Sequence, residues 1–146
     1  MPDDLNYRST LIAVADDCPV TASEVPRPRG GRATVAVLQY EMISAAPHGL
    51  TQEDVLFETW LRRRDDLPPD PPGLAEDRRW ELREAFFSRS QACLRASPLP
   101  RRHGWGLLFD AAGRVALCPM ESAEYRRLVA GAGGVRVLKA MRSRRT

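Results

Sequence analysis

The chain has 146 residues, of which 43% are hydrophobic, 28% charged and 7% aromatic, and its formal net charge at pH 7 is +3. This length supports one hydrophobic core, so we expect a single domain over residues 1–146. The uninterrupted apolar stretches are too short to cross a bilayer, and the apolar content is too high for a disordered chain.

The first third of the sequence predicts two strands before any helix. Residues 6–15 end in a short apolar run that is typical of a buried strand, and Pro19 ends it. Residues 21–31 are rich in proline and arginine, so they are expected to cross the surface without regular structure. Residues 32–44 contain β-branched side chains and apolar residues at both parities, which predicts a strand covered on both faces.

The first predicted helix begins at Thr51. Thr51 and Asp54 have the spacing of a capping box, in which each side chain accepts a hydrogen bond from the other residue's backbone amide. A broad apolar face follows, and Glu58 with Arg62 forms an i, i+4 pair expected on the solvent side. A second helix is predicted over residues 74–87.

Proline and turn residues divide the remaining chain. Residues 65–73 contain four prolines and predict a stiff, extended connector. Residues 91–97 are a candidate strand, ended by the next prolines. Two apolar runs, 105–109 and 114–118, flank a short loop with Asp and Gly, which predicts a β-hairpin.

Residues 121–130 predict a third helix, followed by a glycine-rich cap. Residues 135–141 fit either a strand or a helix, and residues 142–146 form a basic tail that is expected to fray. Together these elements predict an α+β fold, with a mixed, mainly antiparallel sheet and about three helices packed on one face.

Positive charge is concentrated at the C-terminal end. Residues 88–146 contain eleven arginines and Lys139 against three acidic residues, a net charge of +9, whereas residues 1–24 carry a net charge of −4. Anionic ligands are therefore expected to prefer the C-terminal half. Lys139 is the sole lysine, and a genome that favours arginine codons explains the arginine-rich composition equally well.

Two arginine-rich segments are the candidate ligand-binding sites. Their residues are Arg27, Arg29 and Arg32 in the first segment and Arg101, Arg102, His103 and Trp105 in the second. Glycines beside these residues allow the backbone to approach a ligand, and arginine binds phosphate or carboxylate through a forked pair of hydrogen bonds. The alternatives are a solvated loop for the first segment and, for the second, a loop that enters a strand with its tryptophan in the core.

Neither a metal site nor a cofactor is predicted. The three cysteines (Cys18, Cys93, Cys118) and the two histidines lie far apart and lack the close spacing of zinc ligands. No phosphate-binding loop or dinucleotide-binding motif is present. Unpaired cysteines and an acidic N-terminus without signal-peptide character favour the cytoplasm.

Several segments resemble an uncharacterised bacterial family, a domain of unknown function. They are Asp17–Pro19, Pro26–Gly31, Thr34–Tyr40, Thr51–Glu58, Gln91–Pro98, Gly104–Phe109 and Lys139–Arg142. This resemblance covers nearly the whole chain and implies a single-domain, stand-alone cytoplasmic protein. It transfers no activity, cofactor or catalytic residue.

Three functional hypotheses follow from the sequence. The first is a non-enzymatic module that binds an anionic ligand, either nucleic acid or a phosphorylated or carboxylated small molecule, provided that the two arginine-rich segments meet on one face. The second is a small enzyme that uses Cys18 or His103 in a polar cleft. The third is an obligate partner or homodimer with Trp60, Trp80 and Phe87 as anchors, although the sequence leaves the oligomeric state open.

Overall fold

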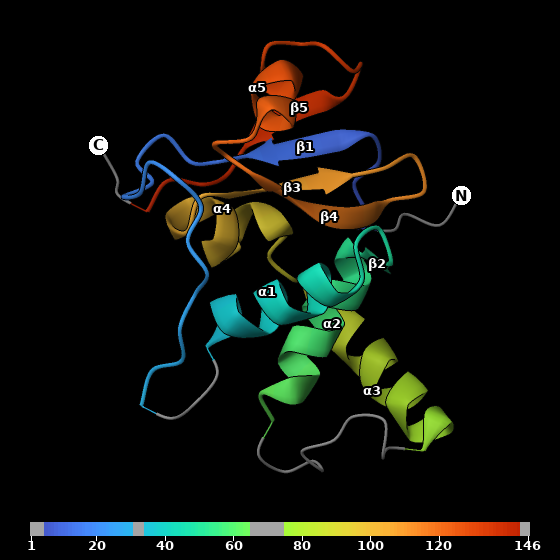
Figure 1. Ribbon diagram of the computed structural model, residues 1–146. Helices are drawn as coiled ribbons and strands as arrows, with labels where there is room; N and C mark the ends of the chain where they lie inside the picture. Colours follow the sequence, from blue (N-terminus) through green and yellow to red (C-terminus); the bar gives the residue numbers. More distant parts are fainter. Residues whose placement is uncertain (1–4, 31–33, 65–74, 144–146) are drawn as a thin grey trace.

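A computed structural model describes residues 5–30, 34–64 and 75–143 (Figure 1). The predicted connector at 65–73 lies outside these residues. Within them the chain forms one five-stranded sheet and five α-helices, in place of the three helices expected from the sequence. In chain order the elements are β1 (Thr10–Ala13), α1 (Val35–Ala45), β2 (Leu50–Thr51), α2 (Gln52–Arg62), α3 (Glu76–Phe87), a 3₁₀ helix (Leu94–Ala96), α4 (Pro98–Arg102), β3 (Trp105–Phe109), β4 (Arg114–Pro119), α5 (Ala123–Val129) and β5 (Arg136–Lys139).

The sheet is mixed and mainly antiparallel, as predicted. Its strand order is β2-β4-β3-β1-β5, and β1 pairs with β5 in the parallel direction while the other pairs are antiparallel. The predicted hairpin is confirmed as β3 and β4, and Gly113 takes the positive φ that its turn requires. The segment 135–141, ambiguous in sequence, forms β5.

Helices cover both faces of the sheet, so the expectation of one covered face is wrong. Neighbouring residues of β1 point to opposite sides: Ile12 joins the main core with α1, α2 and α4, whereas Leu11 packs with Cys118 and with Leu128 of α5. Figure 1 shows α5 on the side of the sheet opposite α1 and α2. Burial of both faces of β1 explains why its apolar run is continuous.

The predicted strand over residues 32–44 is wrong, because this segment forms α1. Thr34 is the N-cap, and its side-chain oxygen accepts a hydrogen bond from the Val37 amide at 3.3 Å. The buried positions along the helix, Ala36, Val37, Gln39, Met42 and Ile43, spread over a wide face. A helix buried on such a broad face is apolar at both parities, so the pattern imitates a doubly covered strand, and tertiary packing overrides the β-branched propensity.

The candidate strand at 91–97 is also wrong. This segment forms the 3₁₀ helix and then the N-cap of α4, where the Ser97 hydroxyl accepts a hydrogen bond from the Leu99 amide at 3.2 Å. Pro98 stands at the first helical position, where proline is favoured because its missing amide proton would have no partner in the helix. Pro98 therefore begins a helix, whereas the prolines were expected to end a strand.

The first residues of the predicted basic tail contact the acidic residues that follow β1. Arg142 lies 3.5 Å from a carboxylate oxygen of Asp16, and the backbone amide of Ser143 donates to Asp17 at 2.9 Å. Lys139 also pairs with Asp16. Asp16 and Asp17, which follow β1, thus anchor the chain as far as residue 143, and the remainder of the predicted tail lies outside the described residues.

Gly106 allows α5 to rest on the sheet, which can be tested by substitution. A Cβ at this position would lie 2.9 Å from the Tyr125 ring and 3.0 Å from the Cys118 carbonyl oxygen, and Tyr125 is fixed because its hydroxyl accepts from the Val14 amide at 2.9 Å. We expect Gly106→Ala to lower the free energy of unfolding by about 1–3 kcal/mol through overpacking, measured by urea denaturation. An unchanged midpoint would contradict this packing of α5.

Candidate functional site

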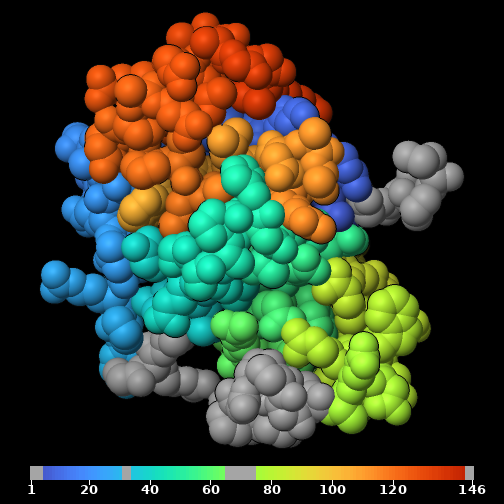
Figure 2. Space-filling model, turned by 45° about the vertical axis from the view of Figure 1, so that its right-hand side comes forward, coloured from blue at the N-terminus to red at the C-terminus, as the bar shows by residue number. Residues whose placement is uncertain are grey.

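The two arginine-rich segments converge on one cavity, which we call the anion pocket. It has a volume of about 240 Å³ and is lined by Pro26, Arg27, Arg29, Thr34, Val35, Ala36, Pro98, Arg102 and His103. Residues 14–30, which follow β1, run from the level of the sheet down the flank of the molecule (Figures 1 and 2). Residues more than 70 positions apart in sequence therefore face the same space.

Backbone contacts hold the two segments together beside this pocket. The Glu24 amide donates to the His103 carbonyl oxygen at 2.9 Å, and the Trp105 indole donates to the Glu24 carbonyl oxygen at 2.8 Å. Gly104 has a φ of +76°, and a Cβ there would lie 2.9 Å from the Ala22 carbonyl oxygen. The close approach of the two segments therefore depends on glycine at this position.

The first turn of α1 contributes backbone dipoles to the pocket. Thr34, Val35 and Ala36 line it, and the Thr34 side chain already satisfies the Val37 amide. The amides of the first helical residues have no acceptor within their own helix, so the N-terminus carries partial positive charge. Side-chain guanidinium groups and helix amides thus present positive charge to the same small volume.

His103 lies half-buried between the pocket's arginines. Burial lowers the pKa of its imidazole below the usual value, Arg102 and Arg29 lower that pKa further, and Glu24 opposes them. The ring is therefore neutral at pH 7 in the unliganded protein. An anion in the pocket would favour its protonated form, which gives the site a titratable group.

Two other described residues proposed from the sequence, Arg101 and Trp105, do not line the pocket. Arg101 extends to the C-terminal segment, where its guanidinium donates to the Ser143 hydroxyl at 3.4 Å. Trp105 packs against Tyr40 with ring centroids 5.4 Å apart, which agrees with the alternative that places this side chain in the core. Arg32 lies outside the described residues.

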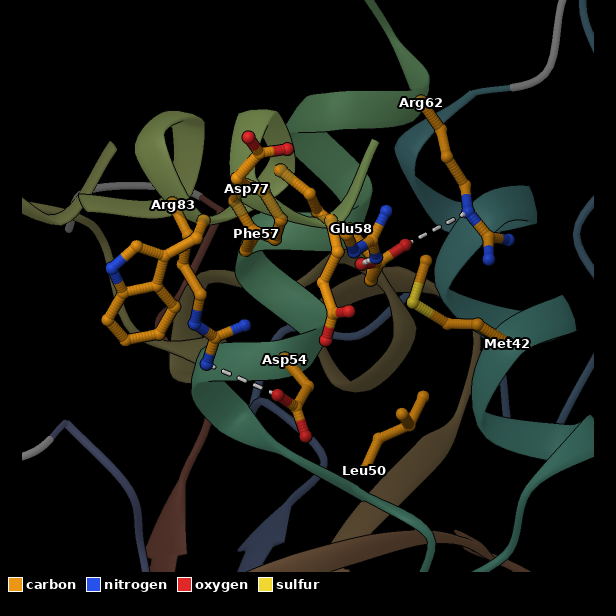
Figure 3. A pocket seen from close by; sticks show the side chains of 11 residues that line it. Met42, Leu50, Asp54, Phe57, Glu58, Arg62, Asp77 and Arg83 are labelled. Carbon is orange, nitrogen blue, oxygen red and sulfur yellow. Dashed lines mark ion pairs between the residues drawn. The ribbon is translucent and has the colours of Figure 1, made fainter. Parts of the chain in front are cut away.

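A larger cavity of about 1010 Å³ lies between α2 and α3 (Figure 3). Its lining contains the apolar side chains of Met42, Leu50, Phe57 and Trp80 together with acidic and basic residues of the two helices. Sequence reasoning missed this cavity because it depends on how two separately predicted helices pack. The exposed Trp80 is the one signal that pointed to this surface.

The charged side chains that line the α2–α3 cavity are largely paired with one another. Figure 3 shows the ion pairs of Asp54 with Arg83, at 3.2 Å, and of Glu58 with Arg62, at 3.6 Å. Glu58 also pairs with Arg79. The capping box at Thr51 is confirmed, but Glu58 is buried, so its expected position on the solvent side is wrong. Arg79 of α3 covers it, and the cluster holds α2 to α3.

None of the three cysteines lines the anion pocket or the α2–α3 cavity. Cys18 is half-buried in the turn after β1, Cys118 is buried, and the pKa of the Cys118 thiol is raised to about 11, chiefly by burial. Among residues 5–30, 34–64 and 75–143, no three His, Cys, Asp or Glu side chains gather as a metal site would require. None of the helices in these ranges is long and apolar enough to span a bilayer.

Comparison by sequence gives a family but no activity. The sequence model of one family, described as a family of unknown function (DUF6157), matches residues 2–146. The chain belongs to the DUF6157 family. No match was found among curated proteins or among solved structures. The resemblance noted in the sequence is thereby confirmed. For this DUF6157 chain we infer a function from the geometry of its cavities.

Because Glu58 is buried and paired with Arg79, we expect its substitution to destabilise the protein more than substitution of the exposed Glu81. Glu58→Gln leaves Arg79 without its charged partner in a partly desolvated place, so we expect the free energy of unfolding to fall by about 2 kcal/mol, measured by urea denaturation. Glu81→Gln is the matched control, since Glu81 pairs with Arg78 at an exposed site of α3 and its loss should change the stability little. Equal effects of the two substitutions would contradict the role of Glu58.

Proposed function

We propose that this protein is a binding module for an anionic ligand, and that the charged group of the ligand occupies the anion pocket. The observation that carries this proposal is the meeting of Arg27, Arg29 and Arg102 with the first turn of α1 in one small cavity. The side chains of all three arginines are exposed, so they can reorganise around an entering group. Forked guanidinium hydrogen bonds and helix amides together suit a phosphate or a carboxylate.

The size of the pocket favours a single charged group. Its volume of about 240 Å³ lies below the range of cavities that enclose a whole drug-sized ligand. The ligand is therefore a phosphorylated or carboxylated small molecule, or a nucleic acid that presents one phosphate to the pocket. We propose that the protein acts in the bacterial cytoplasm, which is in keeping with its three free cysteines.

The anion pocket supports a binding role better than catalysis. Apart from arginines, His103 is the one ionisable residue among the described residues that line the pocket, which include neither a carboxylate nor a cysteine. General acid–base or nucleophilic chemistry needs a second group within hydrogen-bond reach. Of the three anchors in the partner hypothesis, Trp80 is exposed, as that hypothesis requires. Trp60 and Phe87 instead pack against the aromatic cluster of Phe57 and Phe86.

A charge substitution in the pocket should separate specific binding from general attraction. We expect Arg102→Ala to weaken the binding of inorganic pyrophosphate about tenfold or more, measured by isothermal titration calorimetry, because a charge-assisted hydrogen bond is lost. Arg127→Ala is the control, since it removes the same charge from an exposed position of α5 on the other side of the sheet. An equal loss of affinity in both variants would show that binding depends on net charge alone, and would contradict specific binding in the anion pocket.

The neutral state of His103 predicts how anion binding depends on pH. A lowered imidazole pKa means that the folded, unliganded protein loses stability as the pH falls below about 6.5, because the unfolded chain takes up that proton more readily. An anion beside the ring favours the protonated form. Sulfate binding, measured by calorimetry, should therefore strengthen from about pH 7.5 to about pH 5.5.

Sulfate remains a dianion across that range, so the change reports the protein. His103→Gln should bind sulfate with an affinity that hardly varies with pH. If this variant kept the full pH dependence, another group would be responsible and the placement of His103 at the bound anion would be wrong.

A further inference from the structure

A third cavity, which we call the Gln39 cavity, adjoins the anion pocket. It has a volume of about 690 Å³, and Val35 and Pro98 line both spaces. Apolar and aromatic side chains form much of its lining, among them Leu56, Trp60 and Phe86. A volume of this size suits an organic molecule, whereas the anion pocket suits only a charged group.

Polar side chains buried in the protein also line the Gln39 cavity. Gln39, Thr59 and Ser97 are 4%, 7% and 4% exposed, respectively, and all three border the cavity. The Ser97 hydroxyl donates to the Gln39 side-chain oxygen at 2.6 Å, and the Gln39 amide nitrogen donates to the Thr59 hydroxyl at 3.4 Å. These bonds fix the amide group of Gln39 in one orientation.

The side-chain amide of Gln39 has a donor left over. Its nitrogen carries two protons, and Thr59 accepts one of them. Within the described part of the chain the second proton takes part in no other hydrogen bond, although the side chain is almost fully buried. A buried N–H without an acceptor costs free energy. A ligand whose atom accepts a hydrogen bond from this N–H would therefore bind more tightly and more specifically.

We propose that the ligand is a phosphorylated heteroaromatic molecule of the mononucleotide class, with its phosphate in the anion pocket and its ring in the Gln39 cavity. This inference rests on the proposed function, because the anion pocket supplies the charge recognition. The ring packs against Trp60 and Phe86, and one of its acceptor atoms accepts a hydrogen bond from the second N–H of the Gln39 amide. Arg63 and Arg64 line the same cavity and add positive charge to it.

The test compares four kinds of probe by isothermal titration calorimetry. They are inorganic phosphate, ribose 5-phosphate, the four common ribonucleoside 5′-monophosphates and a short single-stranded RNA with blocked ends. We expect at least one mononucleotide to bind about tenfold or more tightly than ribose 5-phosphate, because only the nucleotide fills both cavities. Arg102→Ala should weaken phosphate, ribose 5-phosphate and nucleotide alike.

A substitution at the rim of the Gln39 cavity isolates the contribution of the ring. Ala92 is exposed and borders the cavity, so Ala92→Trp fills the space without altering the buried polar groups. We expect this variant to bind the nucleotide no better than ribose 5-phosphate, with phosphate binding unchanged. Ala111→Trp, at an exposed turn position between β3 and β4, is the matched control and should bind like the original protein.

The possible results distinguish the two proposals. If no phosphate-bearing probe binds, the proposed function itself fails. If phosphate binds in a manner that depends on Arg102 but no nucleotide binds more tightly than ribose 5-phosphate, only the inference of a nucleotide fails. Tighter binding of RNA than of every mononucleotide, unaffected by Ala92→Trp, would overturn the inference in favour of a nucleic-acid surface.

Discussion

The side-chain amide of Gln39 joins three helices in the interior of the protein. It accepts from Ser97, which caps α4, and donates to Thr59, which belongs to α2, while its own backbone belongs to α1. Buried polar groups need hydrogen-bond partners, so these two hydrogen bonds favour one arrangement of the three helices. That arrangement sets the first turn of α1 beside the start of α4.

Both cavities of the candidate site follow from this constraint. Because α1 begins beside Pro98, the segment before α1 meets the residues at the end of α4, and their arginines share one pocket. The other side of the same helix junction leaves the Gln39 cavity open between α1, α2 and the end of α3. The α2–α3 cavity differs in kind, since the pairs of Asp54 and Glu58 with arginines of α3 bind the two helices to each other.

The sequence was most informative where structure is decided locally. The capping box at Thr51 and the turn at Gly113 depend on neighbouring residues, and both predictions were confirmed. The strand expected at 32–44 was wrong because a broadly buried helix and a doubly covered strand have the same apolar composition. The burial of Glu58 could not be predicted, since Arg79, which covers it, belongs to another helix. The arginines of the site were identified by residue type, but their convergence depends on tertiary packing.

The most direct test of the account is a map of backbone amide chemical shifts as inorganic phosphate is added to the isotopically labelled protein. The account predicts that amides at the start of α1, Val35 and Ala36, shift together with those near Arg29 and Arg102, and that all of them saturate with a single Kd. Shifts without saturation, spread over the exposed arginines of α5 and β5, would show that phosphate responds to net charge alone. That result would contradict the central claim that this fold builds an anion pocket.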